Sequence, residues 1–359
     1  MAAHRGARAR IVLVTVGIAG VAAMSGCLYG PPYDQLLTGD EELLGVARDD
    51  YTDAGDRVAM AVIDGDQVRT AFVSADPSTM FELGSATRGL TGLLLADAIE
   101  RGEVAPDDAI GKYLDLGDAP AAALTLRQLA THHSGLPQNP LGPGAWEPPR
   151  SDAGGVVPPD RGGLEALLAR VAVIDLVPQL DYNVSDFDAA LVGQALAAAT
   201  GTSYADLLEE RILEPAGMVD AVVVESADAM PDGLAQGFDT WRTKVAPRGS
   251  GAYAPATGLV VTLDDLIALG HAVLDGRFAD SAALESMDQT RWPRVDIGYF
   301  WERYAHDDGY AVYIVGSSDG FSAALLADPS DGQASILLSN AEVGWPWSRV
   351  LPLMATIED

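Results

Sequence analysis

The chain has 359 residues, 48% of them hydrophobic, and a formal net charge of −30. This length and composition predict a folded globular protein with one large domain or two closely associated ones, and they exclude a disordered or fibrous chain. The acidic charge repels phosphate backbones and argues against nucleic-acid binding. Because Cys27 is the single cysteine, the chain can form neither an intrachain disulfide nor a cysteine-based metal cluster.

The first 26 residues have the pattern of an export signal. Three arginines precede an apolar run over 11–24, which is too short to cross a bilayer as a helix, since that needs about 20 residues. The sequence MSGC at 24–27 then resembles the bacterial lipobox. This resemblance implies removal of residues 1–26 and lipidation of Cys27. We therefore expect an extracytoplasmic lipoprotein anchored to a membrane of the bacterial cell envelope, with a plain secretory signal as the alternative.

The body of the protein is predicted at 45–359, behind a tether at 27–44. It begins with a β-hairpin over 57–73, because Asp-Gly between two apolar runs is a strong turn signal. A helix over 85–101 follows, in which the leucines recur at a roughly helical period, and Gly102 ends it.

The later part of the body alternates between helical and strand-like patterns. A stretch rich in proline and glycine over 137–159 predicts an irregular loop. Strand-like runs at both ends of the body, with helices between them, predict one sheet built from both ends and a helical insertion. The predicted helices are 161–173, 187–200, 203–213, 264–274 and 347–357, and the predicted later strands are 311–315, 322–327 and 334–338.

Several segments of the body belong together as a set of motifs. They include FELGSATR at 81–88, THHSGLP at 131–137, EPAGM at 214–218 and DGFS at 319–322. In this order they resemble the serine hydrolase family of penicillin-binding proteins and serine β-lactamases, specifically its class C β-lactamase, DD-peptidase and esterase group. The resemblance covers about residues 45–357.

The resemblance implies an α/β (α+β) fold in which an antiparallel sheet flanked by helices carries an inserted α-rich domain. The sheet part is expected at about 45–110 and 240–359, and the insertion at about 111–239. A serine at a helix N-terminus would face the cleft between the two parts and attack an acyl carbonyl without a metal or cofactor. The resemblance also implies a small acyl or peptidoglycan-like ligand in the cleft, and it leaves the oligomeric state open.

The family's nucleophile corresponds to Ser85, and a lysine three residues later normally removes its proton. Positions i and i+3 lie on one face of a helix, but here the partner is Arg88. A guanidinium has a pKa above about 12 and does not act as a base in proteins. Arg88 can therefore orient Ser85 but cannot accept its proton. The alternative is that Ser85 only caps the helix.

The family's second motif, Tyr-x-Asn, falls on Val184-Ser185-Asp186 when it is counted back from the glycines at 193 and 201. Valine has no proton to exchange. Tyr182 lies two residues earlier and would need a local bulge to enter the site. Even then, Asn183-Val184 would follow it, so no asparagine would stand two residues after the tyrosine as the motif requires. Tyr182 and Asp186 are nevertheless the candidate substitutes for the missing base.

The third motif, Lys-Thr-Gly or His-x-Gly, reads Ile314-Val315-Gly316, so an isoleucine replaces the cationic or imidazole group. The N–H groups of the backbone remain hydrogen-bond donors when the side chains change. We therefore expect the N–H of Ser317 to form an oxyanion hole with that of Ser85.

The retained catalytic side chain is Ser85 alone, and losing a general base costs about 10²–10⁴-fold in rate. We interpret the chain as a pseudoenzyme, a non-catalytic or very weak serine hydrolase homologue that binds a ligand or partner in its cleft. The alternative is an active esterase, β-lactamase or DD-peptidase that uses Ser85 through an acyl-enzyme. Its base could be Asp186, Asp319 or Glu82, although a carboxylate beside Arg88 is expected to form an ion pair that weakens it as a base.

Two further signals predict no separate site. Residues 316–320 fit G-x-S-x-G, but the α/β-hydrolase elbow needs a helix after the serine and a histidine downstream, and every histidine precedes Ser318. His132 and His133 could act as a base or bind a metal, but the resemblance implies a structural role for this segment.

Overall fold

The structure is a computed structural model that describes residues 36–47, 53, 55–138, 161–177, 182–307 and 309–341, all within one compact unit. Cys27, the signal sequence, most of the predicted loop and the predicted C-terminal helix lie outside the described residues. None of the described helices is long and apolar enough to cross a membrane.

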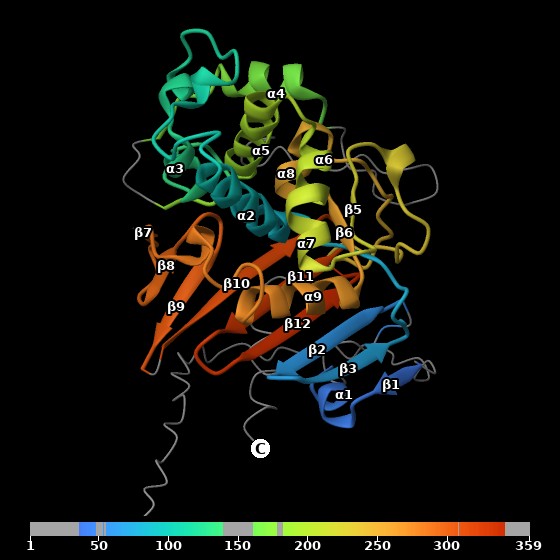
Figure 1. Ribbon diagram of the computed structural model, residues 1–359. Coiled ribbons are helices and arrows are strands. Elements are labelled where there is room, and N and C mark those ends of the chain that lie inside the picture. The colour runs from blue at the N-terminus through green and yellow to red at the C-terminus, as the bar shows by residue number, and fades with distance from the viewer. Residues whose placement is uncertain are drawn as a thin grey trace, which may run out of the picture. The chain divides into compact units, whose positions relative to one another are not determined.

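A nine-stranded antiparallel sheet forms the centre of the fold (Figure 1). Its strands run in the order β1-β3-β2-β12-β11-β10-β9-β8-β7, so strands from both ends of the body lie side by side, as the sequence predicts. The bounds are β1 Leu37–Gly39, β2 Val58–Asp64, β3 Gln67–Val73, β7 Asp288–Gln289, β8 Val295–Ile297, β9 Glu302–His306, β10 Gly309–Ser317, β11 Ser322–Asp328 and β12 Gln333–Ser339.

The predicted hairpin consists of β2 and β3, which meet where Asp64 faces Gln67. Gly65 in the turn has a φ of +55°, a left-handed conformation that glycine adopts without steric cost. On its other edge β2 pairs with β12, where Asp64 faces Gln333. The hairpin therefore lies beside the last strand of the sheet.

Helices pack on the sheet and build the part of the fold beyond it (Figure 1). Ser185 caps α5 by accepting the N–H of Phe187, and Gly201 ends α5 in a left-handed conformation. The helix predicted over 203–213 consists of α6 and a π-helical turn, and α7 continues it beyond the predicted end. The bounds are α1 Glu41–Ala47, α2 Thr87–Glu100, α3 Leu126–Ala130, α4 Leu164–Val171, α5 Asp186–Thr200, α6 Tyr204–Leu208, the π-turn Glu209–Leu213, α7 Glu214–Ala216, α8 Ala254–Thr257 and α9 Leu263–Leu274.

Side chains of the central strands alternate between two apolar faces. In β2, Ala61 and Ile63 belong to the main core, which includes residues of α9 and α2. Met60 and Val62 belong to a second cluster on the opposite face, which α1 covers with Leu43 and Leu44. Burial on both faces explains why β2 has a continuous apolar sequence.

Three parts of the fold differ from the prediction. β1 and the first residues of α1 lie within the segment predicted as a tether, and β1 pairs with β3. The short strands β7, β8 and β9, of which β7 lies at the edge of the sheet, have no strand-like sequence pattern of their own. A separate three-stranded sheet contains β4 Phe81–Glu82, β6 Leu259–Val261 and β5 Val222–Val223, with β6 in the middle.

Candidate active-site cleft

Ser85 lies in a 3₁₀ turn that joins β4 to α2, and the end of β10 passes against this turn. A Cβ on Gly316 would collide with the backbone nitrogen of Ala86. A Cβ on Gly84, whose φ is +56°, would collide with the carbonyl of Ser317. Glycine at both positions thus lets the two backbones touch, which brings Ser317 beside the turn that holds Ser85. The oxyanion hole formed by their N–H groups stays a prediction.

The space beside Ser85 is nearly filled. The cavity there has a volume of about 10 Å³, close to that needed for one water molecule. Arg88, Val184 and Ile314, the positions at which the resemblance implies proton-transferring side chains, all line it with Ser85. Among the described residues, no side chain forms a hydrogen bond with Ser85 Oγ.

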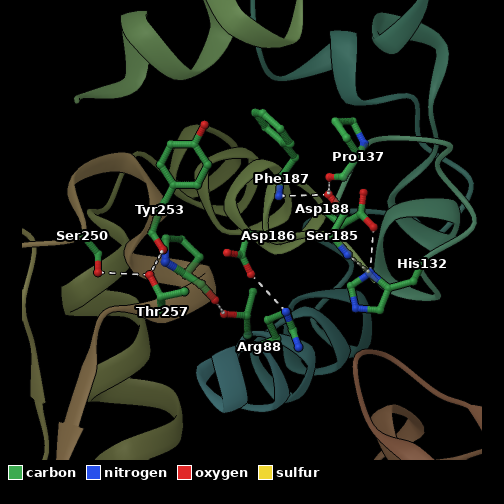
Figure 2. A network of polar contacts seen from close by, with 12 residues as sticks. Arg88, His132, Pro137, Ser185, Asp186, Phe187, Asp188, Ser250, Tyr253 and Thr257 are labelled. Atoms are coloured by element: carbon green, nitrogen blue, oxygen red, sulfur yellow. Dashed lines mark hydrogen bonds and ion pairs between the residues drawn. The ribbon is translucent and has the colours of Figure 1, made fainter. Parts of the chain in front are cut away.

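Arg88 and Arg161 share the carboxylate of Asp186. Figure 2 shows Arg88 extending from α2 to Asp186, the first residue of α5. Nη1 of Arg88 donates to Oδ1 of Asp186 at 3.0 Å, and Nη1 of Arg161 donates to Oδ2 at 3.3 Å. The ion pair expected for a carboxylate beside Arg88 is present, and it holds both oxygens of this candidate base.

Tyr182, the other candidate substitute, has a different partner. Its hydroxyl donates to Oε1 of Glu302 at 2.8 Å, and the residue is buried. Burial and the charge of Glu302 raise the pKa of Tyr182 above its usual value, which disfavours the phenolate that would accept a proton. Val184, rather than Tyr182, lines the cavity at Ser85.

Glu302 is a titratable group that sequence reasoning missed. It begins β9 and lines the same small cavity as Ser85. Burial raises its pKa, with the hydrogen bond from Tyr182 acting in the opposite direction. The sequence holds no motif around this residue. Pairing of β9 with β10, which sets Glu302 opposite Tyr313, brings it to the cleft.

His132 and Asp188 form a buried pair (Figure 2). Nδ1 of His132 and Oδ2 of Asp188 lie 2.7 Å apart, and the N–H of Ser185 also approaches Nδ1 at 3.3 Å. Burial, and then the charge of Arg88, lowers the pKa of His132, whereas burial raises the pKa of Asp188. Both shifts favour the uncharged forms, and the contact ties the segment after α3 to α5, which supports a structural role for His132. Within the described ranges, no group of three His, Cys, Asp or Glu side chains is placed to hold a metal ion.

A larger cavity of about 160 Å³ is lined by the carboxylates of Glu82, Asp186 and Asp319 and by the guanidinium groups of Arg161 and Arg248. Two of the candidate bases, Glu82 and Asp319, thus face this cavity and not the smaller one. Asp319 is paired with Arg248 at 2.8 Å. Burial raises the pKa of Glu82, while the nearby Ser318 hydroxyl and Arg248 act in the opposite direction.

The G-x-S-x-G sequence over 316–320 lies where β10 turns into β11. Ser318 is followed by a strand, and Ser317 pairs with Ser322 across the turn. The elbow of an α/β-hydrolase needs a helix at this point, so its rejection from the sequence is confirmed.

The model of one family, Beta-lactamase, matches residues 48–355. The chain belongs to the beta-lactamase family. One protein with a related sequence is the D-alanyl-D-alanine-carboxypeptidase/endopeptidase AmpH of Escherichia coli strain K12, which is 30% identical to this chain over 193 residues. That match covers 50% of this chain and 48% of AmpH, so the chain spans about half the length of this relative.

Solved structures of beta-lactamase-family proteins have the same fold. The class C beta-lactamase from Rhodobacter sphaeroides has a TM-score of 0.74 and 20% identity, covering 89% of this chain and 100% of that protein. The D-alanine carboxypeptidase AmpC from Burkholderia cenocepacia has a TM-score of 0.69 and 19% identity, covering 88% of this chain and 98% of that protein. The predicted beta-lactamase fold, with its antiparallel sheet and flanking helices, is confirmed.

Proposed function

We propose that this chain is a lipoprotein of the bacterial cell envelope that hydrolyses acyl substrates very weakly or not at all and binds a ligand in its cleft. The observation that carries the proposal is the surroundings of Ser85. A permanently charged arginine stands three residues later, and no side chain of the described residues accepts a hydrogen bond from the Ser85 hydroxyl. A serine without a base is a poor nucleophile.

The side chains around Ser85 support the loss of proton transfer. Val184 and Ile314 present only alkyl groups to the cavity, and Arg88 is engaged with Asp186 at 3.0 Å. Neither the alkyl groups nor the guanidinium can accept a proton, and both oxygens of the Asp186 carboxylate already accept hydrogen bonds from arginines. In addition, a cavity of about 10 Å³ leaves little room for an acyl group beside the serine.

The larger cavity supports a binding role. It has about 160 Å³ and charged groups of both signs, which give a small polar ligand its orientation. The names of AmpH and of the Burkholderia protein describe D-alanine carboxypeptidases, which supports a small acyl or peptidoglycan-like ligand for this chain.

A second candidate is an active ester or amide hydrolase that uses Ser85 through an acyl-enzyme. Glu302 favours it, because this carboxylate lines the cavity at Ser85 and its pKa is raised by burial. A glutamate with a raised pKa is suited to act as a general base near neutral pH. One water molecule would have to carry the proton between Ser85 and Glu302, since the two form no direct hydrogen bond.

Hydrolysis of a chromogenic cephalosporin and of a p-nitrophenyl ester by the purified chain tests the proposal. We expect the wild type and the Ser85→Ala variant to have equal rates within about twofold, because the serine carries no activated proton. Intact-mass analysis after incubation with the cephalosporin should find no acyl adduct.

A fall in rate on Ser85→Ala, or an adduct that this variant lacks, would contradict the proposal and support the second candidate. Glu302→Gln then decides the base, with a loss of about 10²–10⁴-fold expected if Glu302 is the general base. Thermal unfolding of each variant separates lost chemistry from lost folding.

A further inference from the structure

Trp241 is exposed at the tip of a tight turn. Its exposed fraction of 79% is the largest among the aromatic residues that the structure describes. Tryptophan combines a large apolar ring with one N–H donor, and it is enriched where a surface meets a partner or a layer of lipid headgroups. A single exposed apolar residue needs no partner, so the surroundings of Trp241 decide whether it belongs to a binding surface.

The turn that carries Trp241 is held in one conformation. Phe238 and Lys244 pair across its base, and the N–H of Asp239 donates to the carbonyl of Thr243 at 3.0 Å. Oδ1 of Asp239 accepts the N–H groups of Trp241 and Thr243 at 3.0 and 2.7 Å. Because these contacts fix the backbone in advance, little conformational entropy remains to be lost when the indole meets a partner.

Arg242 fastens this turn to the segment that precedes β2. Its guanidinium forms ion pairs with Asp53, at 2.9 Å, and with Asp56. The guanidinium also lies over the ring of Phe238, 5.2 Å from its centre. The same ring packs so closely on Gly55 that a Cβ there would collide with it. The turn is thus held at the end of the sheet where β2 begins.

Leu36, which precedes β1, lies at the same end of the sheet. Val58, the first residue of β2, faces Val73, the last residue of β3, and Val73 also faces Leu37, the first residue of β1. Leu36 has an exposed fraction of 65%. One end of the sheet therefore presents two strongly exposed apolar residues, Leu36 and Trp241.

The short sequence between Cys27 and Leu36 keeps this end of the sheet near a membrane once Cys27 is lipidated. Leu36 is nine positions after Cys27, and an extended chain spans at most about 3.6 Å per residue, so the two residues are separated by no more than roughly 30 Å. Such confinement gives the bilayer surface a high effective concentration. A contact too weak for a free protein is then populated in the anchored one.

The chemistry of the turn suits lipid headgroups. An indole is favourable at the level of the headgroups, where its ring meets hydrocarbon and its N–H meets water or a polar group. Lys244 is exposed at the base of the turn and can donate to a lipid phosphate. Since the chain has a formal net charge of −30, an anionic bilayer would repel much of its surface, which favours this local contact on zwitterionic lipid.

We propose that this end of the sheet docks on the phospholipid bilayer, with the indole of Trp241 among the headgroups and Leu36 facing the same surface. The inference rests on the proposed function, because it needs the lipid anchor at Cys27. It adds a second point of contact, which gives the anchored body one orientation to the membrane.

Quenching by brominated lipid tests the docking. The lipidated full chain is reconstituted into vesicles of phosphatidylcholine and phosphatidylethanolamine, with and without brominated phosphatidylcholine, which quenches indoles that enter the bilayer. We expect the wild type to lose more emission than Trp241→Ser, by up to about one sixth, because Trp241 is one of six tryptophans. The matched control is Trp292→Ser, which removes an exposed tryptophan between β7 and β8, at the other edge of the sheet, and should leave the bromine-dependent loss in place.

Flotation of the vesicles separates the docking from the anchor. A chain that floats with the vesicles, while bromine quenches the wild type and Trp241→Ser equally, would overturn the docking and leave the lipid anchor standing. A wild-type chain that does not float would overturn the anchor of the proposed function, and the docking with it. Because Trp241 is exposed, its replacement should leave the thermal unfolding of the chain unchanged.

Discussion

Asp186 keeps two cations in place at the edge of the cleft. The side chains of Arg88, Arg161 and Asp186 have exposed fractions of only 14%, 17% and 16%. A partly buried charge needs a partner, since water solvates it poorly there. Asp186 therefore stabilises the position of Arg88 next to Ser85, whatever the chemistry of the serine.

Replacement of this carboxylate by an amide, Asp186→Asn, is expected to destabilise the fold by about 2 kcal/mol, because two partly buried guanidinium groups lose their counter-ion. Urea unfolding of the purified variant measures the change. The matched control is Asp307→Asn, which removes the carboxylate of an exposed pair with Arg294 and should change little. Equal changes in the free energy of unfolding for the two substitutions would show that the shared carboxylate of Asp186 stabilises the fold no more than an exposed ion pair does.

At the residue scale, the side chains that lie within recognisable motifs were predictable from the sequence. Those that tertiary contacts bring into the site were not. Spacing from a recognisable segment placed Arg88, Val184 and Ile314 around Ser85, and these residues do line one cavity. Glu302 could not be found this way, because its place depends on the register with which β9 pairs with β10. Spacing fixes neighbours along a helix or strand but carries no information on pairing across a sheet.

At the scale of elements, the buried contact between His132 and Asp188 fastens α5 to the segment after α3. Burial lowers the pKa of the histidine and raises that of the aspartic acid, so folding favours a neutral histidine beside a protonated aspartic acid. In the unfolded chain the two groups titrate near their usual pKa values, about 6.5 and about 3.9.

This difference predicts a pH dependence of stability. Above about pH 6.5 the unfolded chain has released both protons and the folded pair still holds one, so the free energy of unfolding should fall by up to about 1.4 kcal/mol per pH unit as pH rises. Below about pH 3.9 the unfolded chain binds two protons, and stability should fall as pH drops. Between these limits the pair contributes no slope. Urea unfolding midpoints between pH 5 and pH 8.5 measure the alkaline limb.

Asp188→Asn gives the control for this limb. The variant holds a neutral histidine beside an amide and has no proton to lose above pH 6.5, so its contribution to the alkaline fall should vanish. Its stability should instead decrease below about pH 6.5, where the unfolded histidine takes up a proton. An identical alkaline slope in the wild type and the variant would mean that other groups cause it.

Elements with strong local signals were predictable, and those defined by their neighbours were not. The turn at Asp64 and Gly65, the capping box of Thr262 and Asp265 at the start of α9, and the glycine that ends α5 all depend on local backbone chemistry. Strands β7 and β8 have two and three residues, and pairing with their neighbours rather than apolar alternation defines them.

At the scale of the whole molecule, membrane attachment is predicted to depend on Cys27, which lies outside the described residues. Cys27→Ser should abolish lipid labelling of the chain and move it from the membrane fraction to the soluble fraction, because no acyl chain then holds it in the bilayer. Fractionation of cells that express the chain, followed by immunoblotting, measures the change.

An inhibitor of the lipoprotein signal peptidase provides an independent control, since it should leave the wild-type chain at its unprocessed mass and have no effect on the Cys27→Ser variant. Membrane attachment of the serine variant equal to that of the wild type would show that some other feature anchors the chain.

The pairing of β2 with β12 governs when the chain can become compact. Asp64, the last residue of β2, and Gln333, the first residue of β12, face each other, although 269 positions separate them along the chain. Contacts between residues so far apart in the sequence form late in folding, because closing the long loop between them costs conformational entropy. If the proposed lipoprotein is exported N-terminus first, β2 stays without its neighbour β12 until almost the whole sequence has crossed the membrane. In that case, the strand order would delay the final folding of the sheet until export is nearly complete.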